Sequence, residues 1–231
     1  MAIYTKLDKE KVVSIISNYN LGNMNNYQGI KEGIENTNYL VETDKGKYIL
    51  TIYEKRVNMD DLPFFSKLME ELSNKKFICP KPILNKNNKY ISDLGSKKFM
   101  LVSYLEGKSK TNLSPDDCSS VGKQAARLHE ITKNFDFKRD NDLSVKSWRR
   151  IFDQVKDKCN RIHPDLPKLI ETNLEDVEKD WPENLPKGII HADLFHDNIF
   201  FKNNNFSGFI DFYFSCNDFY AFEIAICLNA L

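Results

Sequence analysis

The chain has 231 residues, enough for one large domain or two small ones with a substantial core. Lys plus Arg and Asp plus Glu each total 33, so the formal net charge is zero and gives no support to nucleic-acid binding. No apolar run approaches the roughly 20 residues of a membrane-spanning helix, and the N-terminus lacks the layout of a signal peptide. The five scattered cysteines contain no C-x-x-C pair, which favours reduced thiols. We therefore expect a soluble cytoplasmic protein without nucleic-acid or membrane partners; nothing in the composition indicates its oligomeric state.

The first hundred residues combine strand and helix patterns. Apolar residues at helical spacing follow Asp8, and a run of alternating residues around Asp-Lys-Gly predicts a β-hairpin. The expected elements are a helix over 8–19, the hairpin over 37–54, a helix over 61–75, and strands within 79–91 and 97–105. We therefore expect residues 1–104 to form an N-terminal lobe built on a mostly antiparallel sheet that carries helices.

The remaining residues are mostly helical in pattern. Ser114 is the expected N-cap of a long helix, with Pro115 at its first position and acidic residues in its first turn. Further helices are expected over 147–161 and 165–180. Residues 105–231 would therefore form a mostly helical C-terminal lobe, which makes the fold class α+β with two lobes. Because the chain stops inside an apolar stretch that reads as a buried helix, we expect a truncated chain whose C-terminal helices are missing.

The stretch "GIIHADLFHDNIFF", Gly188 to Phe201, contains several polar residues between two apolar runs that read as short strands. Asn198 precedes a strand, an Asn-rich turn and a second strand that ends before Asp211. In an antiparallel hairpin these two residues would be neighbours, with Asp193 one loop away. Three side chains with oxygen ligands at one end of a sheet suit a hard cation such as Mg²⁺. A capped turn with an Asx hydrogen bond is the simpler explanation for Asp193 and Asn198 taken alone.

This arrangement has the parts that phosphoryl transfer requires: one carboxylate for the acceptor hydroxyl, and an Asn and an Asp for Mg²⁺. "H-A-D-L-F-H-D-N" followed by "D-F-Y" has the order and spacing of the protein-kinase pair H-R-D-L-x-x-x-N and D-F-G. The missing Arg after the histidine and the missing Gly after "DF" point away from protein kinases.

The chain resembles the aminoglycoside-phosphotransferase-like small-molecule kinases, whose loop reads H-x-D-x-x-x-x-N, and within them the homoserine kinases of this fold. The resemblance covers nearly the whole chain and is most specific in "GIKEGIENTNYLVET" and "SGFIDFYFSCNDFYAFEIAICLNA". It implies a bilobal protein-kinase-like fold and the ATP-dependent phosphorylation of the L-homoserine side-chain hydroxyl, a step toward threonine. ATP and Mg²⁺ are the implied cofactors.

By this resemblance Asp193 is the catalytic base, and Asn198 and Asp211 are the Mg²⁺ ligands. His191 would brace the loop without reacting. For the amino-acid substrate, arginine is suited to grip a carboxylate, and Arg149 and Arg150 in "SWRRIF" are candidates together with Tyr213. A surface helix with solvated arginines is an equally good explanation for that pair.

The expected nucleotide-binding residues lie in the N-terminal lobe and at its end. The segment "GIKEGIENTN" occupies the position of the loop that covers the phosphates, although its glycines do not make a G-x-G-x-x-G motif. "SYLEG" is the expected hinge beside the adenine. The candidate residues are Gly29, Gly33, Asn36, Asn38, Thr51, Ser103 and Leu105.

One departure from related kinases concerns the ion pair that contacts the phosphates. Thr51 stands where these kinases carry Lys or Arg, and Phe65 stands about where the acidic partner is expected. Lys55 and Arg56 lie just downstream and are candidates for the missing charge, or are simply solvated. We expect a modified phosphate clamp.

Three alternatives remain open at this point. The first is a related kinase for another alcohol: choline, methylthioribose or an aminoglycoside. The second is a metal-dependent hydrolase that uses His191, Asp193, His196 and Asp197, although their spacing makes simultaneous ligation awkward. The third is a nucleotide-binding pseudokinase, which the missing clamp lysine favours and the intact Asp193, Asn198 and Asp211 oppose.

Overall fold

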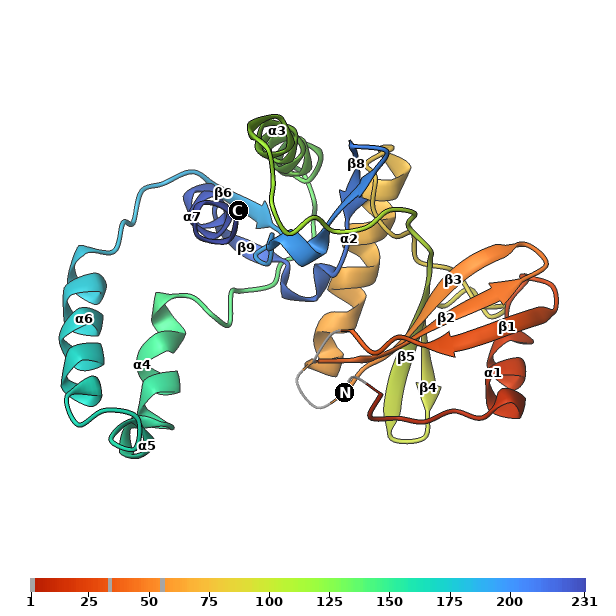
Figure 1. Ribbon diagram of the computed structural model, residues 1–231, viewed down its shortest axis with the longest axis horizontal. Helices are drawn as coiled ribbons and strands as arrows, with labels where there is room; N and C mark the ends of the chain where they lie inside the picture. Colours follow the sequence, from red (N-terminus) through yellow and green to blue (C-terminus); the bar gives the residue numbers. More distant parts are fainter. Residues whose placement is uncertain (1–2, 33–34, 55–56) are drawn as a thin grey trace.

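The computed structural model describes residues 3–32, 35–54 and 57–231, and Figure 1 shows their arrangement in two lobes. The N-terminal lobe contains a five-stranded antiparallel sheet in the order β1-β2-β3-β5-β4. Its elements are α1 (Lys9–Ile16), β1 (Met24–Gly29), β2 (Thr37–Thr43), β3 (Gly46–Ile52), η1 (Met59–Asp61), α2 (Leu62–Asn74), β4 (Ile91–Leu94) and β5 (Lys97–Ser103).

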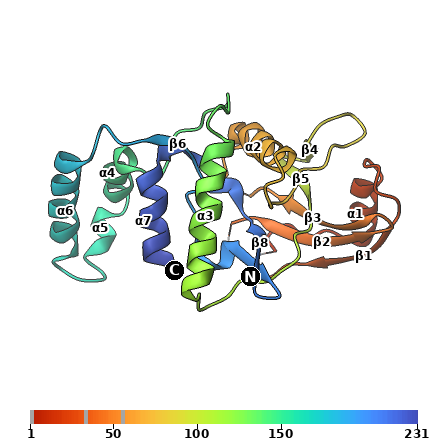
Figure 2. The same ribbon diagram turned by 90° about the horizontal axis from the view of Figure 1, so that it is seen from above.

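The C-terminal lobe is mostly helical and carries two short antiparallel strand pairs, β6 with β9 and β7 with β8. In Figure 2, α3 and α7 lie side by side next to these strands. The elements are α3 (Pro115–Ile131), α4 (Val145–Asp153), α5 (Lys156–Cys159), α6 (Leu166–Asp180), β6 (Lys187–Ile190), η2 (His196–Asn198), β7 (Ile199–Lys202), β8 (Asn205–Phe209), η3 (Phe212–Phe214), β9 (Cys216–Phe219) and α7 (Tyr220–Ala230).

Local sequence signals explain most of these elements. In β2 every second side chain is buried, as expected for a strand with one face on the core. The Ser114 hydroxyl accepts a hydrogen bond from the Asp117 N–H, and the Asp117 carboxylate accepts one from the Ser114 N–H. This capping box fixes the start of α3, as predicted.

Two segments differ from the expectation. β1 was not predicted, because its sequence MNNYQG is polar and its burial pattern shows little alternation. The strand expected within 79–91 is absent apart from the first residue of β4; Pro80 and Pro82 interrupt that segment, and only an isolated bridge joins Pro82 to Val102. Proline lacks the N–H that a strand ladder requires.

The largest hydrophobic cluster extends through both lobes. It includes Phe65 and Leu68 of α2, Leu128 of α3 and Phe209 of β8, each at most 1% exposed. A second cluster packs α1 on the sheet, and a third joins α4, α5 and α6. Because the largest cluster is common to both lobes, it restrains their relative position.

The connection from β5 to α3 is attached to the C-terminal lobe. Lys108 and Phe201 of β7 exchange two backbone hydrogen bonds of 2.9 and 3.0 Å. The backbone of Gly107 has φ +139°, and a Cβ there would lie 3.0 Å from the Phe201 carbonyl oxygen. Glycine is therefore required where the connection meets β7.

The helices α4, α5 and α6 extend away from the rest of the lobe (Figure 1). The single helix expected over 147–161 is interrupted after Asp153, and α5 begins at Lys156. The ring of Trp181, after α6, contacts Trp148 and Phe222 at centroid distances of 5.3 and 6.3 Å.

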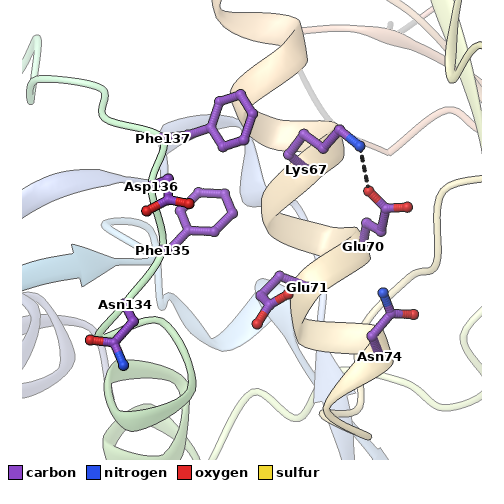
Figure 3. Close-up of a pocket in the computed structure, with 8 residues that line it drawn as sticks. All are labelled: Lys67, Glu70, Glu71, Asn74, Asn134, Phe135, Asp136 and Phe137. Carbon is purple, nitrogen blue, oxygen red and sulfur yellow. Dashed lines mark hydrogen bonds and ion pairs between the residues drawn. The ribbon is translucent and has the colours of Figure 1, made fainter.

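A cavity of about 200 Å³ lies between α2 and the loop that follows α3 (Figure 3). Phe135 and Phe137 point toward α2 from the loop, and the Lys67–Glu70 ion pair lies on the helix. Across residues 3–32, 35–54 and 57–231, no helix has the length and hydropathy needed to span a membrane.

Candidate active site

The loop that carries Asp193 begins where β6 ends, and a buried carboxylate from α7 fixes its backbone. Glu223, 1% exposed, accepts hydrogen bonds from the N–H groups of His191 (3.0 Å) and Ala192 (2.8 Å). Burial raises the pKa of Glu223 to about 7, although both N–H groups act to lower it. Ala192 has φ +63°, a left-handed conformation that costs free energy in a residue other than glycine. The contact with Glu223 compensates for that cost.

His191 connects this loop to the second loop of the site. Its Nε2 lies 2.9 Å from the carbonyl oxygen of Ile210, and its ring packs against Phe212 at a centroid distance of 4.7 Å. Complete burial lowers the pKa of His191 to about 4, so the ring is neutral at pH 7 and Nε2–H donates to the carbonyl. The histidine therefore acts through the backbone and has no direct route to solvent.

The side chains of Asp193 and Asn198 are joined by a hydrogen bond. The Asn198 side-chain nitrogen donates to the Asp193 carboxylate at 2.7 Å and to the Asp193 carbonyl oxygen at 2.8 Å. These bonds fix the orientation of both side chains. Because Nδ2 is used in this way, Oδ1 is the Asn198 atom that could bind a cation.

The hairpin of β7 and β8 places Asp211 close to Asn198. Ile199 pairs with Phe209, and the Ile210 N–H donates to the Asn198 carbonyl oxygen at 3.0 Å. Asp211 follows directly, with φ +62° and ψ +62°. The predicted hairpin is therefore present. A left-handed backbone at a non-glycine residue is strained, and such strain is common at functional sites.

The carboxyl groups of Asp193 and Asp211 affect each other's titration. Burial, together with the charges of Asp211, Asp197 and Glu35, raises the pKa of Asp193 to about 7, while the hydrogen bond from Asn198 acts to lower it. Burial and the charges of Glu35 and Asp197 together raise the pKa of Asp211 to about 6, while the Tyr213 N–H acts to lower it. Solvent reaches Asp211 although protein surrounds it on many sides, so the neighbouring negative charges account for part of this increase. A divalent cation here would reverse both shifts.

The side chains expected at the phosphates form bonds within the N-terminal sheet. Thr51 donates to Asn38 Oδ1 at 2.8 Å across the β2–β3 pair, and Thr51 is only 2% exposed. Asn36 Oδ1 accepts from the Glu54 N–H at 3.3 Å. These contacts stabilise the strand ends. Thr51, Asn38 and Asn36 are uncharged, so they provide no positive charge to bind phosphate.

Of the two glycines expected in the phosphate loop, the structure describes Gly29. Gly29 ends β1, and a Cβ there would lie 2.3 Å from Ile3 Cδ1, so the close approach of the N-terminal segment accounts for glycine. Gly33 lies outside the described residues, as do Lys55 and Arg56, the candidates for the clamp charge.

Ser103 and Leu105 lie where the chain passes from one lobe to the other. Ser103 ends β5, and its hydroxyl accepts a hydrogen bond from the Lys81 N–H at 2.8 Å. Leu105 follows in the connection, beside Gly208 of β8. The connection from β5 to α3 includes the positions 104–105, where the lobe boundary is expected. That boundary and the roles of these residues at the adenine remain predictions.

The three candidates for acceptor binding lie in different surroundings. Arg149 of α4 makes a bidentate ion pair with Glu178 of α6, with nitrogen–oxygen distances from 2.6 to 3.1 Å. Arg150 is exposed on the same helix. Tyr213 packs against two rings of the N-terminal lobe, Tyr53 and Phe65. Sequence spacing could not distinguish these settings.

The donors at this site fit a hard divalent cation. They are the carboxylates of Asp193 and Asp211 and the side-chain oxygen of Asn198, all oxygen ligands. Within the described ranges, no group of three His, Cys, Asp or Glu side chains has the geometry to hold a metal ion. His191, which a zinc hydrolase would need, is fully buried against Ile210. The structure thus gives no support to the metal-dependent hydrolase.

Two residues of this site had no signal in the sequence. Glu223 lies on the apolar helix α7, and its carboxylate accepts hydrogen bonds from the loop of Asp193. Arg139 lies in the segment between α3 and α4, and it contacts the carbonyl groups of Phe214 and Ser215. Both act over long sequence separations, which local patterns do not reveal.

Residues 26–231 match the profile of the phosphotransferase enzyme family, abbreviated APH. The chain belongs to the phosphotransferase enzyme family. A homoserine kinase of Rhizobium meliloti (strain 1021) is 42% identical to this family member over 230 residues, which covers 100% of this chain and 71% of the relative. A homoserine kinase of Methylobacterium nodulans is 44% identical, with 100% of this chain and 72% of the relative covered.

Solved structures confirm the α+β, protein-kinase-like fold. An amicoumacin kinase in complex with AMP-PNP and Ca²⁺ has a TM-score of 0.72 and 17% identity, and covers 97% of this chain and 69% of its own. A choline kinase from Cryptosporidium parvum has a TM-score of 0.69 and 21% identity, and covers 94% of this chain and 68% of its own. At these identities the likeness concerns the fold.

Proposed function

We propose that this phosphotransferase-family protein is an ATP-dependent homoserine kinase that converts L-homoserine to O-phospho-L-homoserine. The observation that carries the proposal is the pairing of Asp193 with Asn198 at 2.7 Å, one hairpin away from Asp211. The curated homoserine kinases, 42% identical over the whole chain, support the acceptor.

In this proposal Asp193 orients the acceptor hydroxyl and accepts its proton. A pKa of about 7 suits a group that must take up a proton near neutral pH. Asn198 and His191 position the carboxylate through the contacts described above. Phosphoryl transfer depends mainly on positioning and on stabilisation of charge, which is the contribution that fixed side chains provide.

Asn198 and Asp211 would hold Mg²⁺, which neutralises charge on the transferred phosphoryl group. The solvent exposure of Asp211 leaves the residue open to a ligand. Gly29, Gly33, Asn36, Asn38 and Thr51 are proposed to line the phosphate side of ATP, and Ser103 and Leu105 the adenine side. Arg149 and Arg150 remain the proposed contacts for the acceptor carboxylate, and Arg149 would have to leave Glu178 to reach it.

The proposed location of the protein is the cytoplasm, where ATP and reduced thiols occur together. All five cysteines are free thiols in the structure. The protein would act on a small molecule, without nucleic acid or membrane as partner.

A substrate panel tests the proposal. ADP formation from Mg-ATP is measured with L-homoserine, D-homoserine, L-serine, choline, methylthioribose and an aminoglycoside, with Asp193→Ala protein as the background control. Selective turnover of L-homoserine is the expected result. Turnover of another alcohol would keep the kinase reaction and replace the acceptor. Binding of Mg-ATP without turnover of any acceptor would support a pseudokinase.

A further inference from the structure

Tyr213 connects the loop of Asp211 to two elements of the N-terminal lobe. It lies in η3, two residues after Asp211. Its ring packs edge-on against Tyr53, which follows β3, at a centroid distance of 5.2 Å and an angle of 85°. It packs in the same way against Phe65 of α2, at 5.7 Å and 86°. Tyr53 and Phe65 are 0% and 1% exposed, so Tyr213 contacts the rigid core of the other lobe.

The same loop reaches α2 by a second route. The Arg139 guanidinium lies 5.3 Å from the Phe65 ring and contacts the carbonyl oxygens of Phe214 and Ser215 at 3.5 and 3.4 Å. Phe65 is therefore contacted by Tyr213 of the loop and by an arginine that is bonded to the loop. A residue of α2 thus takes part in both contacts.

By the resemblance to small-molecule kinases, Thr51 of β3 and Phe65 of α2 stand about where related kinases carry the basic and acidic residues of an ion pair. Neither residue is charged, so these two positions provide no charge attraction between β3 and α2. Burial raises the pKa of Tyr213 to about 12 and the pKa of Tyr53 well above its usual value, so both are neutral. Among the described residues, the buried Tyr53 hydroxyl has no hydrogen-bond partner. The contact is therefore carried by the rings.

We propose that Tyr213 is a positioning residue that sets Asp211 relative to β3 and α2, in place of an ion pair between those two elements. This inference rests on the proposed kinase function. It replaces the expectation that Tyr213 binds the acceptor. Edge-on aromatic pairs contribute stabilisation beyond the area that they bury, so two such pairs can restrain one loop.

The experiment separates the ring from the hydroxyl and nucleotide binding from turnover. Tyr213→Phe keeps the ring, Tyr213→Ala removes it, and Tyr19→Ala is the control, a buried tyrosine of the second hydrophobic cluster. The dissociation constant of Mg-ADP is measured by calorimetry over a series of Mg²⁺ concentrations. Turnover and KM are then measured for each substrate.

Tyr213→Phe is expected to stay within about threefold of the unaltered protein, because the rings carry the contact. Tyr213→Ala is expected to lower kcat about 10- to 100-fold, the range expected for a misplaced reacting group. It should also raise the Mg²⁺ concentration needed for nucleotide binding, with little change in the acceptor KM. Tyr19→Ala should lower thermal stability and leave nucleotide binding unchanged.

Unchanged nucleotide binding and kcat in Tyr213→Ala would overturn the inference. A raised acceptor KM with normal Mg-ADP binding would also overturn it, in favour of acceptor binding. If Tyr213→Ala does not fold, Phe65→Leu removes the partner ring from α2, and normal Mg-ADP binding in that variant would contradict the inference. If the unaltered protein does not phosphorylate homoserine, the proposed function fails, whereas Mg-ADP binding still tests Tyr213.

Discussion

Arg139 and Asp61 form an ion pair between the segment that follows α3 and the turn that precedes α2, with Nε 2.7 Å from the carboxylate. Their side chains are 12% and 21% exposed, so solvent screens this pair less than an ordinary surface pair. Arg139 also donates to the backbone carbonyl groups of Phe214 and Ser215, whereas the Asp61 carboxylate accepts from Arg139 in the ion pair. Arg139 and Asp61 are therefore expected to contribute unequally to the free energy of unfolding.

We expect Arg139→Ala to lower the free energy of unfolding more than Asp61→Ala, because the arginine variant also leaves two carbonyl groups without a donor. A double-mutant cycle in urea should give a coupling energy of about 1 kcal/mol for this partly exposed pair. Equal effects of the two single variants would show that the carbonyl contacts of Arg139 add nothing to the ion pair, and additive effects in the double variant would show that the ion pair itself contributes nothing.

Asp193→Asn and Asp211→Asn should separate catalysis from metal binding. Asparagine at 193 cannot accept the proton of the acceptor, so kcat should fall by at least about 100-fold while Mg-ADP binding stays near normal. Asparagine at 211 removes a charged ligand, so Mg-ADP binding itself should weaken. Calorimetry and a coupled ADP assay measure both quantities. Near-normal turnover of Asp193→Asn would refute its assignment as the base.

Glu223→Gln tests whether the α7 carboxylate fixes the loop of Asp193. The carboxylate accepts from two N–H groups, whereas glutamine offers one oxygen and places an NH₂ group beside the other donor. The expected cost in stability is about 1–3 kcal/mol for the unpaired buried donor. Turnover should also fall, because Ala192 loses the contact that offsets its left-handed backbone. Asp218→Asn, also in this region, is the control. Full activity of Glu223→Gln would assign the residue a purely structural role.

His129 gives a pH-dependent prediction. Its ring stacks on Tyr220 at 4.2 Å, and burial lowers its pKa to about 4. The unfolded chain, with a pKa near 6.5, binds the proton more readily, so this residue reduces stability as the pH falls from about 6.5 to about 4. His129→Phe keeps a stacked ring and cannot titrate. The difference in the free energy of unfolding between this variant and the unaltered protein should be about 1–2 kcal/mol more favourable to the variant at pH 5 than at pH 8. This amount is reduced because His129 is partly exposed. Thermal unfolding across this range measures it, and a pH-independent difference would contradict the assignment.

Local patterns in the sequence predicted the elements whose signals are local. The capping box at Ser114, the hairpin of β2 and β3 and the hairpin of β7 and β8 all depend on residues a few positions apart. The last of these hairpins was sufficient to bring Asn198 and Asp211 together. The break between α4 and α5 and the absence of a strand before β4 were missed, because tertiary packing and prolines outweigh the apolar pattern there.

The contacts that position the site could not be predicted in this way. Glu223 reaches Ala192 over 31 residues, and Arg139 reaches Ser215 over 76. A glutamate on an apolar helix and an arginine in a loop each have many possible partners. The direction of Tyr213, toward the N-terminal lobe, depends on the left-handed backbone of Asp211, which the residue type does not indicate.

The dependence of the Asp193 loop on Glu223 also determines when the site can form during synthesis. The ribosome adds about 5–20 residues per second, so Glu223 is made about 2–6 s after Ala192. β9, the partner of β6, is likewise made after the loop. The strands of the N-terminal sheet all end by Ser103, so they are made much earlier. The nascent chain therefore passes through a stage in which these strands have been made and the Asp193 loop is incomplete, and the loop can be completed only after α7 has been made.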